Sequence, residues 1–101
     1  MSTPWSVQIH EHGRSGRIDY CEGDRVASVE WEFGGGDVVA IIMSSSPEEW
    51  DRRYPWAAGR QSEILRRIGG EVVAQKARTC VVDFDARETR WLCIREPAAK
   101  G

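Results

Sequence analysis

The sequence has few cysteines, no long apolar run and no excess of charge of one sign. Its three cysteines, Cys21, Cys80 and Cys93, are odd in number and widely spaced, which argues against a disulfide framework. The longest apolar run, Val38–Met43, is far shorter than the roughly 20 residues that cross a bilayer. Residues 1–5 lack the basic patch and apolar stretch of a signal peptide. These absences predict a cytoplasmic protein that does not insert into a membrane.

The composition is that of an ordinary globular domain. Charged residues make up 30% of the chain, and 14 basic against 16 acidic residues leave a net charge of −2. That charge is too small to indicate a nucleic acid or a membrane surface as partner. A chain of 101 residues predicts one domain, residues 1–101, with a single core. A surface site or a shallow groove is therefore easier to accommodate than a deep reaction chamber.

The first half of the chain alternates apolar and polar residues in four segments. Three turns separate these segments, and each turn contains glycine. The segments are 5–10, 18–21, 27–33 and 37–44. Alternation with period two is typical of strands, and short turns between them predict an antiparallel meander. The fourth segment is apolar on both faces, which predicts a central strand with something covering each side.

The pattern then changes to that of helices. Ser46-Pro47-Glu48-Glu49 combines a serine cap, proline at the first helical position and a glutamate three residues after the cap. Tyr54 precedes proline and is disfavoured in a helix, so the first helix should be short, and Pro55 can open the second. Glycines 69 and 70 suggest either a close crossing over the sheet or a break. The buried stripe of the second helix is predicted at Ala58, Gln61, Leu65, Ile68 and Val72.

Two further strands are expected at the C-terminal end of the chain. Residues 79–85 alternate again, and 90–95 form the last strand, while 96–101 should be a frayed tail. The predicted fold class is therefore α+β, in the order ββββ-αα-ββ. A four-stranded antiparallel meander is followed by a short and a longer helix on one sheet face, and then by a C-terminal hairpin.

Several residue groups invite a chemical interpretation. His10 and His12 share one strand face and could begin a zinc site, but no nearby side chain completes four ligands, and solvated histidines are the alternative. The pairs Asp83 with Asp85 and Glu30 with Glu32 could divide acid and base roles, or simply mark the wet face of a sheet. Glycines 34–36 lead into a strand rather than a helix, so a turn is expected instead of a phosphate loop. No cofactor, metal or catalytic residue is predicted.

Five tryptophans in 101 residues are unusually many for a domain of this size. Trp31 and Trp91 fit strand faces and are predicted in the core, with Trp5 closing its end. The segment between the two helices mixes aromatic and charged side chains, which is typical of binding hot spots. The alternative is that its tryptophans fasten the short helix to the sheet. The candidate partner-binding residues of this segment are Trp50, Arg52, Arg53, Tyr54 and Trp56.

Charge is distributed unevenly along the sequence. The strand segments carry most of the early acids, and Asp19, Glu30 and Glu32 complete the set of candidate partner-binding residues. The helical half carries most of the arginines. The molecule could therefore have an acidic and a basic side that steer a charged partner, or two independently solvated surfaces.

The stretch 30–42, followed by Trp50, by Tyr54-Pro55-Trp56-Ala57 and by Arg60, looks like that of small bacterial proteins. In size, architecture and aromatic content the chain resembles the immunity proteins that neutralise polymorphic toxins. That resemblance implies a protein that occludes the active site of a toxin, with acids suited to a basic, nuclease-like partner. A self-associating subunit, a single-stranded nucleic-acid binder using arginines and tryptophans, and a small enzyme are the alternatives.

Overall fold

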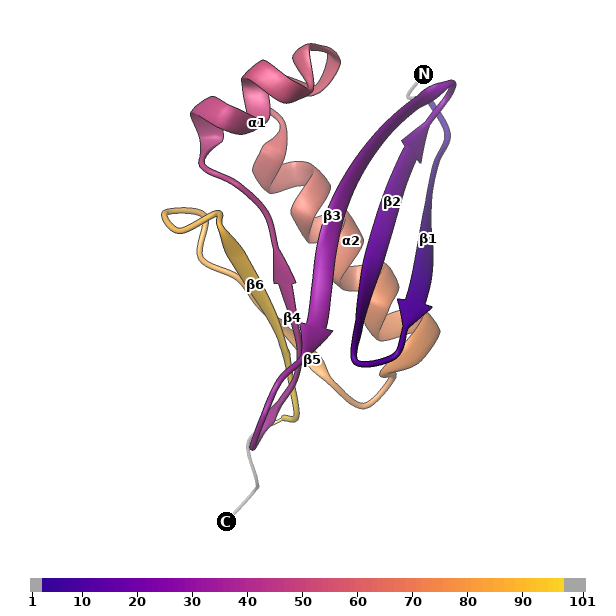
Figure 1. Cartoon of the computed structure of the whole chain (residues 1–101), viewed down its shortest axis with the longest axis vertical. Helices are drawn as coiled ribbons and strands as arrows, with labels where there is room; N and C mark the ends of the chain where they lie inside the picture. The colour runs from indigo at the N-terminus through magenta and orange to yellow at the C-terminus, as the bar shows by residue number, and fades with distance from the viewer. Residues whose placement is uncertain (1–2, 98–101) are drawn as a thin grey trace.

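Within residues 3–97, which the computed structural model describes, six strands form one antiparallel sheet. The first four follow one another as a meander: β1 (Trp5–His12), β2 (Ser15–Glu22), β3 (Arg25–Phe33) and β4 (Val38–Met43). The C-terminal hairpin adds β5 (Val81–Asp83) and β6 (Trp91–Arg95). The strand order β1-β2-β3-β4-β6-β5 places β6 beside β4 and β5 at the edge. The predicted α+β fold, ββββ-αα-ββ, is confirmed (Figure 1).

The helical segment begins as the sequence predicts. Helix α1 (Pro47–Arg53) is capped by the Ser46 hydroxyl, which accepts a hydrogen bond from the Glu49 amide at 3.3 Å. The prediction that Pro55 opens the second helix is wrong. Pro55–Ala57 makes only a 3₁₀ turn, and Gly59 then adopts a left-handed conformation that no helix continues through. Helix α2 (Gln61–Lys76) therefore starts later, and Ala58 lies exposed rather than on its buried stripe.

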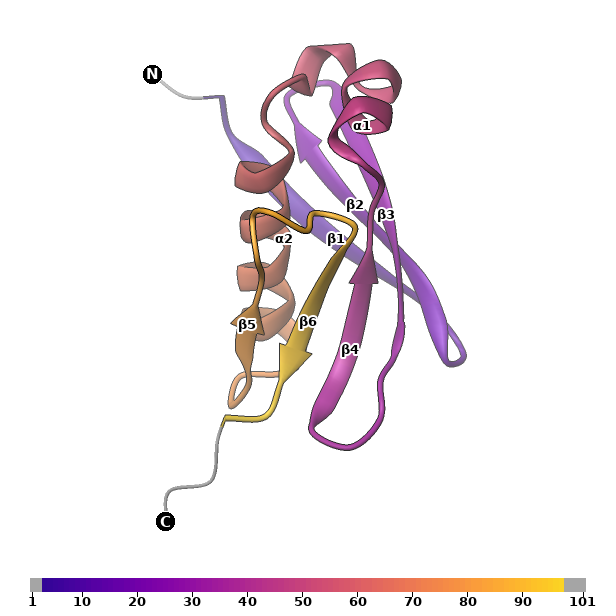
Figure 2. The ribbon, with the colours of Figure 1, turned by 90° about the vertical axis from the view of Figure 1, so that its left-hand side faces the viewer.

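Helix α2 lies across one face of the sheet (Figure 2). The helix is unbroken, and Gly69 packs directly against the strands. A methyl group at position 69 would lie 3.0 Å from Val82 and 3.1 Å from Leu92, so the predicted close crossing is confirmed. The core between helix and sheet includes Ile18, Tyr20, Val29, Trp31, Ile42, Ile64, Leu65, Ile68, Leu92 and Ile94.

The opposite face of the sheet has no such cover in the described part of the chain. In β4, Ala40 and Ile42 are buried toward α2, whereas Ile41 and Met43 face the other way and stay half-buried. The prediction that this strand is covered on both sides is therefore wrong for residues 3–97. The prediction of Trp91 in the core is also wrong, since Leu92 and Ile94 take the inward positions of β6 and leave Trp91 53% exposed.

The C-terminal hairpin is shorter than its sequence pattern suggests. Turns at Cys80 and at Asp85 restrict β5 to three residues, so Asp85 does not share a strand face with Asp83. Of the predicted frayed tail 96–101, residues 98–101 lie outside the described part of the chain. Among the helices of residues 3–97, none has the length and apolar character needed to span a membrane.

A glycine in β2 allows a tryptophan of β3 to reach across to β1. The Trp31 indole N–H donates a hydrogen bond of 3.1 Å to the His10 carbonyl oxygen, passing over Gly16 between them. A Cβ atom at position 16 would overlap that carbonyl oxygen and lie 2.7 Å from the indole nitrogen. The absence of a side chain at position 16 is therefore a packing requirement.

We expect Gly16→Ala to destabilise the fold by about 1–3 kcal/mol, because the methyl group must displace either the β1 backbone or the Trp31 ring. Gly35→Ala is the matched control, since a Cβ atom there meets nothing within 4 Å. Urea denaturation of both variants measures the difference. Equal stability of the two variants would contradict this account of the β1–β2–β3 packing.

Candidate functional site

Strands β3 and β4 separate part of the way along the sheet. They pair only over Glu30–Phe33 and Ala40–Met43, and that register, continued past Val29 and Ser44, would set Ser28 opposite Ser45. The Tyr54 hydroxyl occupies that place instead, accepting from the Ser28 amide and donating to the Ser28 carbonyl oxygen, both at 3.1 Å. A side chain from the end of α1 thus replaces a strand neighbour for β3.

The β4 side of the separation is satisfied from α2. The Gln61 amide nitrogen donates to the Ser45 carbonyl oxygen at 2.7 Å and to the Ser44 hydroxyl at 3.1 Å. Gln61 is 4% exposed, so this amide is one of the few buried polar side chains in the described residues. The helical segment therefore lies at the gap between the two strands and satisfies the Ser28 amide, the Ser28 carbonyl and the Ser45 carbonyl there.

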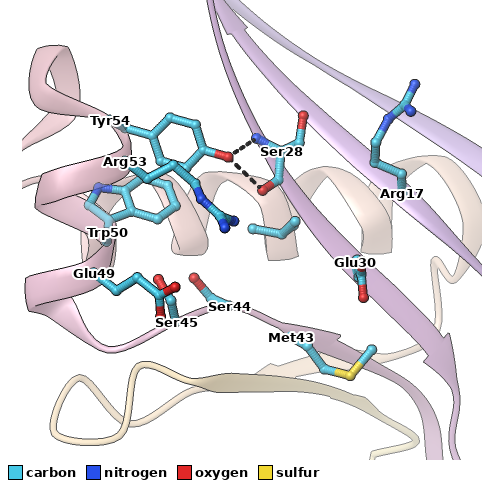
Figure 3. A pocket seen from close by; sticks show the side chains of 11 residues that line it. Arg17, Ser28, Glu30, Met43, Ser44, Ser45, Glu49, Trp50, Arg53 and Tyr54 are labelled. Carbon is cyan, nitrogen blue, oxygen red and sulfur yellow. Dashed lines mark hydrogen bonds between the residues drawn. The ribbon is translucent and has the colours of Figure 1, made fainter.

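A groove of about 360 Å³ fills the space between the separated strands and α1 (Figure 3). Its walls come from three places in the sequence: β2 and β3 on one side, the end of β4 below, and α1 on the other. The lining residues are Arg17, Ser28, Val29, Glu30, Met43, Ser44, Ser45, Glu49, Trp50, Arg53 and Tyr54.

The groove carries charges that the described part of the chain does not neutralise. Glu30 and Glu49 on opposite walls, and Arg53 between them, have no ion-pair partner within residues 3–97. Figure 3 shows the Arg53 guanidinium directed into the groove. The two carboxylates can accept charge-assisted hydrogen bonds from a molecule in the groove, and the guanidinium can donate them.

Next to the groove, Asp19 joins three neighbours on the uncovered face. It accepts hydrogen bonds from the Ser28 hydroxyl at 2.7 Å and from Arg17 and His10 at 3.0 Å each. Burial opposes its ionisation, but these hydrogen bonds outweigh burial and hold the pKa of Asp19 below its usual value. His10 and Ser28 both contact the carboxylate rather than each other. The cluster therefore lacks the serine-to-imidazole hydrogen bond of an acyl-transfer triad.

Apolar side chains continue the same face beyond the groove. Register places Met43 between Glu30 and Trp91, and Ile41 between Glu32 and Cys93. Val81, opposite Arg95 at the sheet edge, is 49% exposed. An apolar strip, made of Ile41, Met43, Trp91 and Cys93, therefore lies beside the two acidic side chains of β3. The ion pair of Arg95 with Asp83, at 2.6 Å, separates this strip from Val81.

The structure brings together two groups that are far apart in sequence. Of the predicted partner-binding residues, Glu30 lines the groove opposite Trp50, Arg53 and Tyr54. Asp19 and Glu32 lie on the same sheet face. Trp50 is 1% exposed and donates from its indole nitrogen to the Ala57 carbonyl oxygen at 3.0 Å, so this hydrogen bond fastens α1 to the 3₁₀ turn rather than to the sheet. Arg52 is exposed but does not line the groove.

Sequence reasoning did not select Arg17, Ser28 or the serines after β4. Their positions become visible only once the separation of β3 from β4 is known. The apolar strip did leave a signal in the sequence, because the fourth strand is apolar on both faces.

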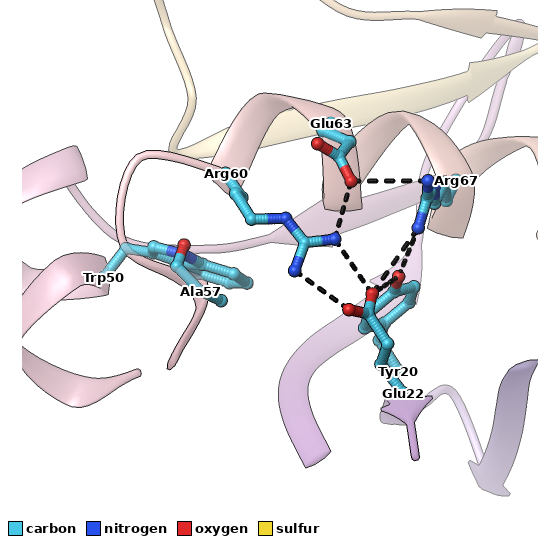
Figure 4. Close-up of polar contacts among 7 residues, drawn as sticks. All are labelled: Tyr20, Glu22, Trp50, Ala57, Arg60, Glu63 and Arg67. Carbon is cyan, nitrogen blue, oxygen red and sulfur yellow. Dashed lines mark hydrogen bonds and ion pairs between the residues drawn. The ribbon is translucent and has the colours of Figure 1, made fainter. Parts of the chain in front are cut away.

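Arg60 belongs to a different cluster, on the side of the sheet that α2 covers (Figure 4). Trp56 stacks on Tyr20 of the same cluster, with ring centroids 6.5 Å apart. Arg60 binds Glu22 through two hydrogen bonds of 2.9 and 3.0 Å and also contacts Glu63 at 2.7 Å. Arg67 donates to the Tyr20 hydroxyl at 2.6 Å. Hydrogen bonds from Arg60 and then from Tyr20 lower the pKa of Glu22 to about 2. This cluster joins the first turns of α2 to the end of β2.

The prediction of one acidic and one basic side is therefore wrong in part. Two helical arginines, Arg60 and Arg67, are neutralised by Glu22, and Lys76 pairs with Glu11 at 3.0 Å. In residues 3–97 no three side chains among histidine, cysteine, aspartate and glutamate gather as metal ligands would. His10 is instead held by Asp19.

Comparison of the chain with protein-family models, curated proteins and solved structures gives no match. The functional assignment therefore rests on the residues of the uncovered face.

We expect Tyr54→Phe to destabilise the protein by about 1–3 kcal/mol, because it leaves the Ser28 amide and carbonyl without a partner. Thermal and urea unfolding measure the loss. If the variant matches the wild type in both, the hydroxyl does not support the separated strands.

Acid should weaken the attachment of α2 to β2. The pKa of Glu22 is about 2 in the folded protein against an ordinary value of 4.5, so its contribution is complete above pH 4.5 and is lost as the pH falls toward 2. We expect Glu22→Gln to be less stable near neutral pH and to show a flatter decline over that window. Urea midpoints measured from pH 7 to pH 2 test this. Glu71→Gln, elsewhere on α2, is the control and should retain the wild-type pH profile.

Proposed function

We propose that this protein is a protein-binding module whose partner covers the uncovered face of the sheet. The observation that carries the proposal is β4, which is apolar on both faces and has only one of them covered by α2 in residues 3–97. Strands with two apolar faces are normally buried on both. An external partner supplies the second cover.

The composition of this face supports protein recognition. The apolar strip supplies an apolar centre, and Trp91, at 53% exposure, is of the residue type that most often dominates binding energy. The groove and the exposed Glu30 and Glu32 supply a polar border. Since these glutamates and Glu49 have no ion-pair partner in residues 3–97, the complementary surface presents arginine or lysine beside an apolar side chain.

A toxin-neutralising immunity protein is the specific form of the proposal. A protein of this kind blocks a toxin by covering its active site, and an acidic face beside an apolar strip complements a basic, substrate-binding cleft. Nucleic acid itself fits the face less well. Phosphates would meet Glu30, Glu32 and Glu49, and the buried Trp50 is not available to stack on a base.

The test has two stages. The chain is first co-expressed with the products of neighbouring genes, and its complexes and its own oligomeric state are measured by light scattering after size exclusion. Affinity is then measured by calorimetry for variants of the uncovered face. We expect Trp91→Ala to weaken binding at least tenfold, or by about 1.4 kcal/mol or more. Glu30→Arg should weaken it further through charge repulsion.

Two control variants match these changes. Phe33 has the same exposure as Trp91, 53%, but lies toward the helix-covered side, so Phe33→Ala should bind normally. Asp24→Arg reverses a fully exposed charge in the β2–β3 turn and should also be neutral. A dimer of the chain alone that Trp91→Ala dissociates would identify the partner as a second copy. A partner bound equally by Trp91→Ala and Glu30→Arg would refute the assignment of this face.

A further inference from the structure

A second pocket lies on the other side of the sheet, between the strands and the C-terminal half of α2. Its volume is about 180 Å³, and its walls are almost entirely apolar. The lining residues are Ile9, Glu11, Ile18, Trp31, Phe33, Ala40, Ile42, Val72 and Lys76. All the strand residues among them point toward α2, so the pocket shares no side chain with the groove or with the apolar strip.

The pocket exists because the helix is shorter than the sheet that it covers. Helix α2 ends at Lys76, whereas the β3–β4 hairpin continues past its last turn (Figure 1). The apolar faces of the strands therefore extend beyond the end of the helix. Ala40 and Val72 both line the space that is left, and a side chain larger than that of Ala40 would fill it. Phe33 packs edge-on against Trp31 and is 53% exposed, which marks the open side of the pocket.

Among residues 3–97, the charged residues that line the pocket are Glu11 of β1 and Lys76 at the end of α2, which form a salt bridge. Lys76 Nζ lies 3.0 Å from Glu11 Oε2, and both side chains are about half exposed. The pair is therefore part of the pocket mouth. Together the two groups can accept one hydrogen bond and donate another to a molecule whose apolar body lies inside.

We propose that this pocket binds a small, largely apolar molecule, about the size of one aromatic ring, with a single uncharged polar end group at the Glu11–Lys76 pair. The size follows from the volume, since an engineered apolar cavity of about 150 Å³ binds benzene. The polar end is uncharged because each charge at the mouth is already neutralised by the other. The inference is independent of the proposed protein-binding function, which uses the opposite face of the sheet.

Phenol is the probe, with benzene as its counterpart without the polar end. We expect phenol, titrated into the labelled wild-type protein, to give saturable amide shifts in two-dimensional NMR confined to the lining residues. Ala40→Leu fills the pocket and should weaken phenol at least tenfold. Val26→Leu, an exposed change on the opposite face, should bind phenol as the wild type does. Lys76→Met should weaken phenol severalfold and leave benzene unchanged.

Several outcomes would overturn the inference. The first is a wild-type protein that gives no saturable shifts with either probe. The second is a folded Ala40→Leu variant that binds phenol as tightly as the wild type. If Ala40→Leu does not fold, Phe33→Ala replaces it, because Phe33 is half exposed and tolerates truncation. Phenol affinity unchanged in that variant would equally exclude the pocket. Equal losses of phenol and benzene in Lys76→Met would remove the polar end group from the assignment.

Discussion

The Tyr54 hydroxyl stands where β3 and β4 part, and the arrangement of the uncovered face depends on it. By accepting from and donating to the backbone of Ser28, it lets a strand edge end inside the molecule without an unsatisfied amide or carbonyl. Across the gap, Gln61 donates a hydrogen bond to the Ser45 carbonyl oxygen. Without these two side chains the strands would be driven to pair further, and the space that forms the groove would close.

The same segment serves both sides of the sheet. Trp50, in the middle of α1, donates a hydrogen bond to the Ala57 carbonyl oxygen and so fastens the 3₁₀ turn. Helix α2 then begins beside the ion pair of Glu22 with Arg60. Helix α2 is thereby held at its start by ion pairs and along its middle by the close contact at Gly69. Helix α2 covers one face of the sheet. The other face carries an apolar strip beside acids that have no ion-pair partner within residues 3–97. Such an asymmetry is costly for a monomer in water and useful to a protein that binds another.

Much of the fold could be predicted from the sequence, because its signals are local. Alternation defined the strands, Ser46 and Pro47 defined the start of α1, and paired glycines indicated the crossing of α2. What could not be predicted depends on contacts between distant segments. Alternation shows that Trp91 and Leu92 face opposite ways but not which of them faces the helix. Helix α2 starts late because Gly59 adopts a left-handed conformation, whereas the sequence pattern favoured a start at Pro55. The position of Glu30 and Arg53 in one groove depends on the strand separation, which no local pattern encodes.

The most direct test of this account is amide hydrogen exchange in the native protein at two positions of β3. Ser28 and Val26 both direct their amides away from β2, toward the side that β4 has left, but only Ser28 meets an acceptor there, the Tyr54 hydroxyl. The account predicts that the Ser28 amide exchanges slowly, with protection approaching that of the central strands, and that the Val26 amide exchanges rapidly. Equally rapid exchange at both positions would show that the strand separation is not held by Tyr54 and would contradict the account.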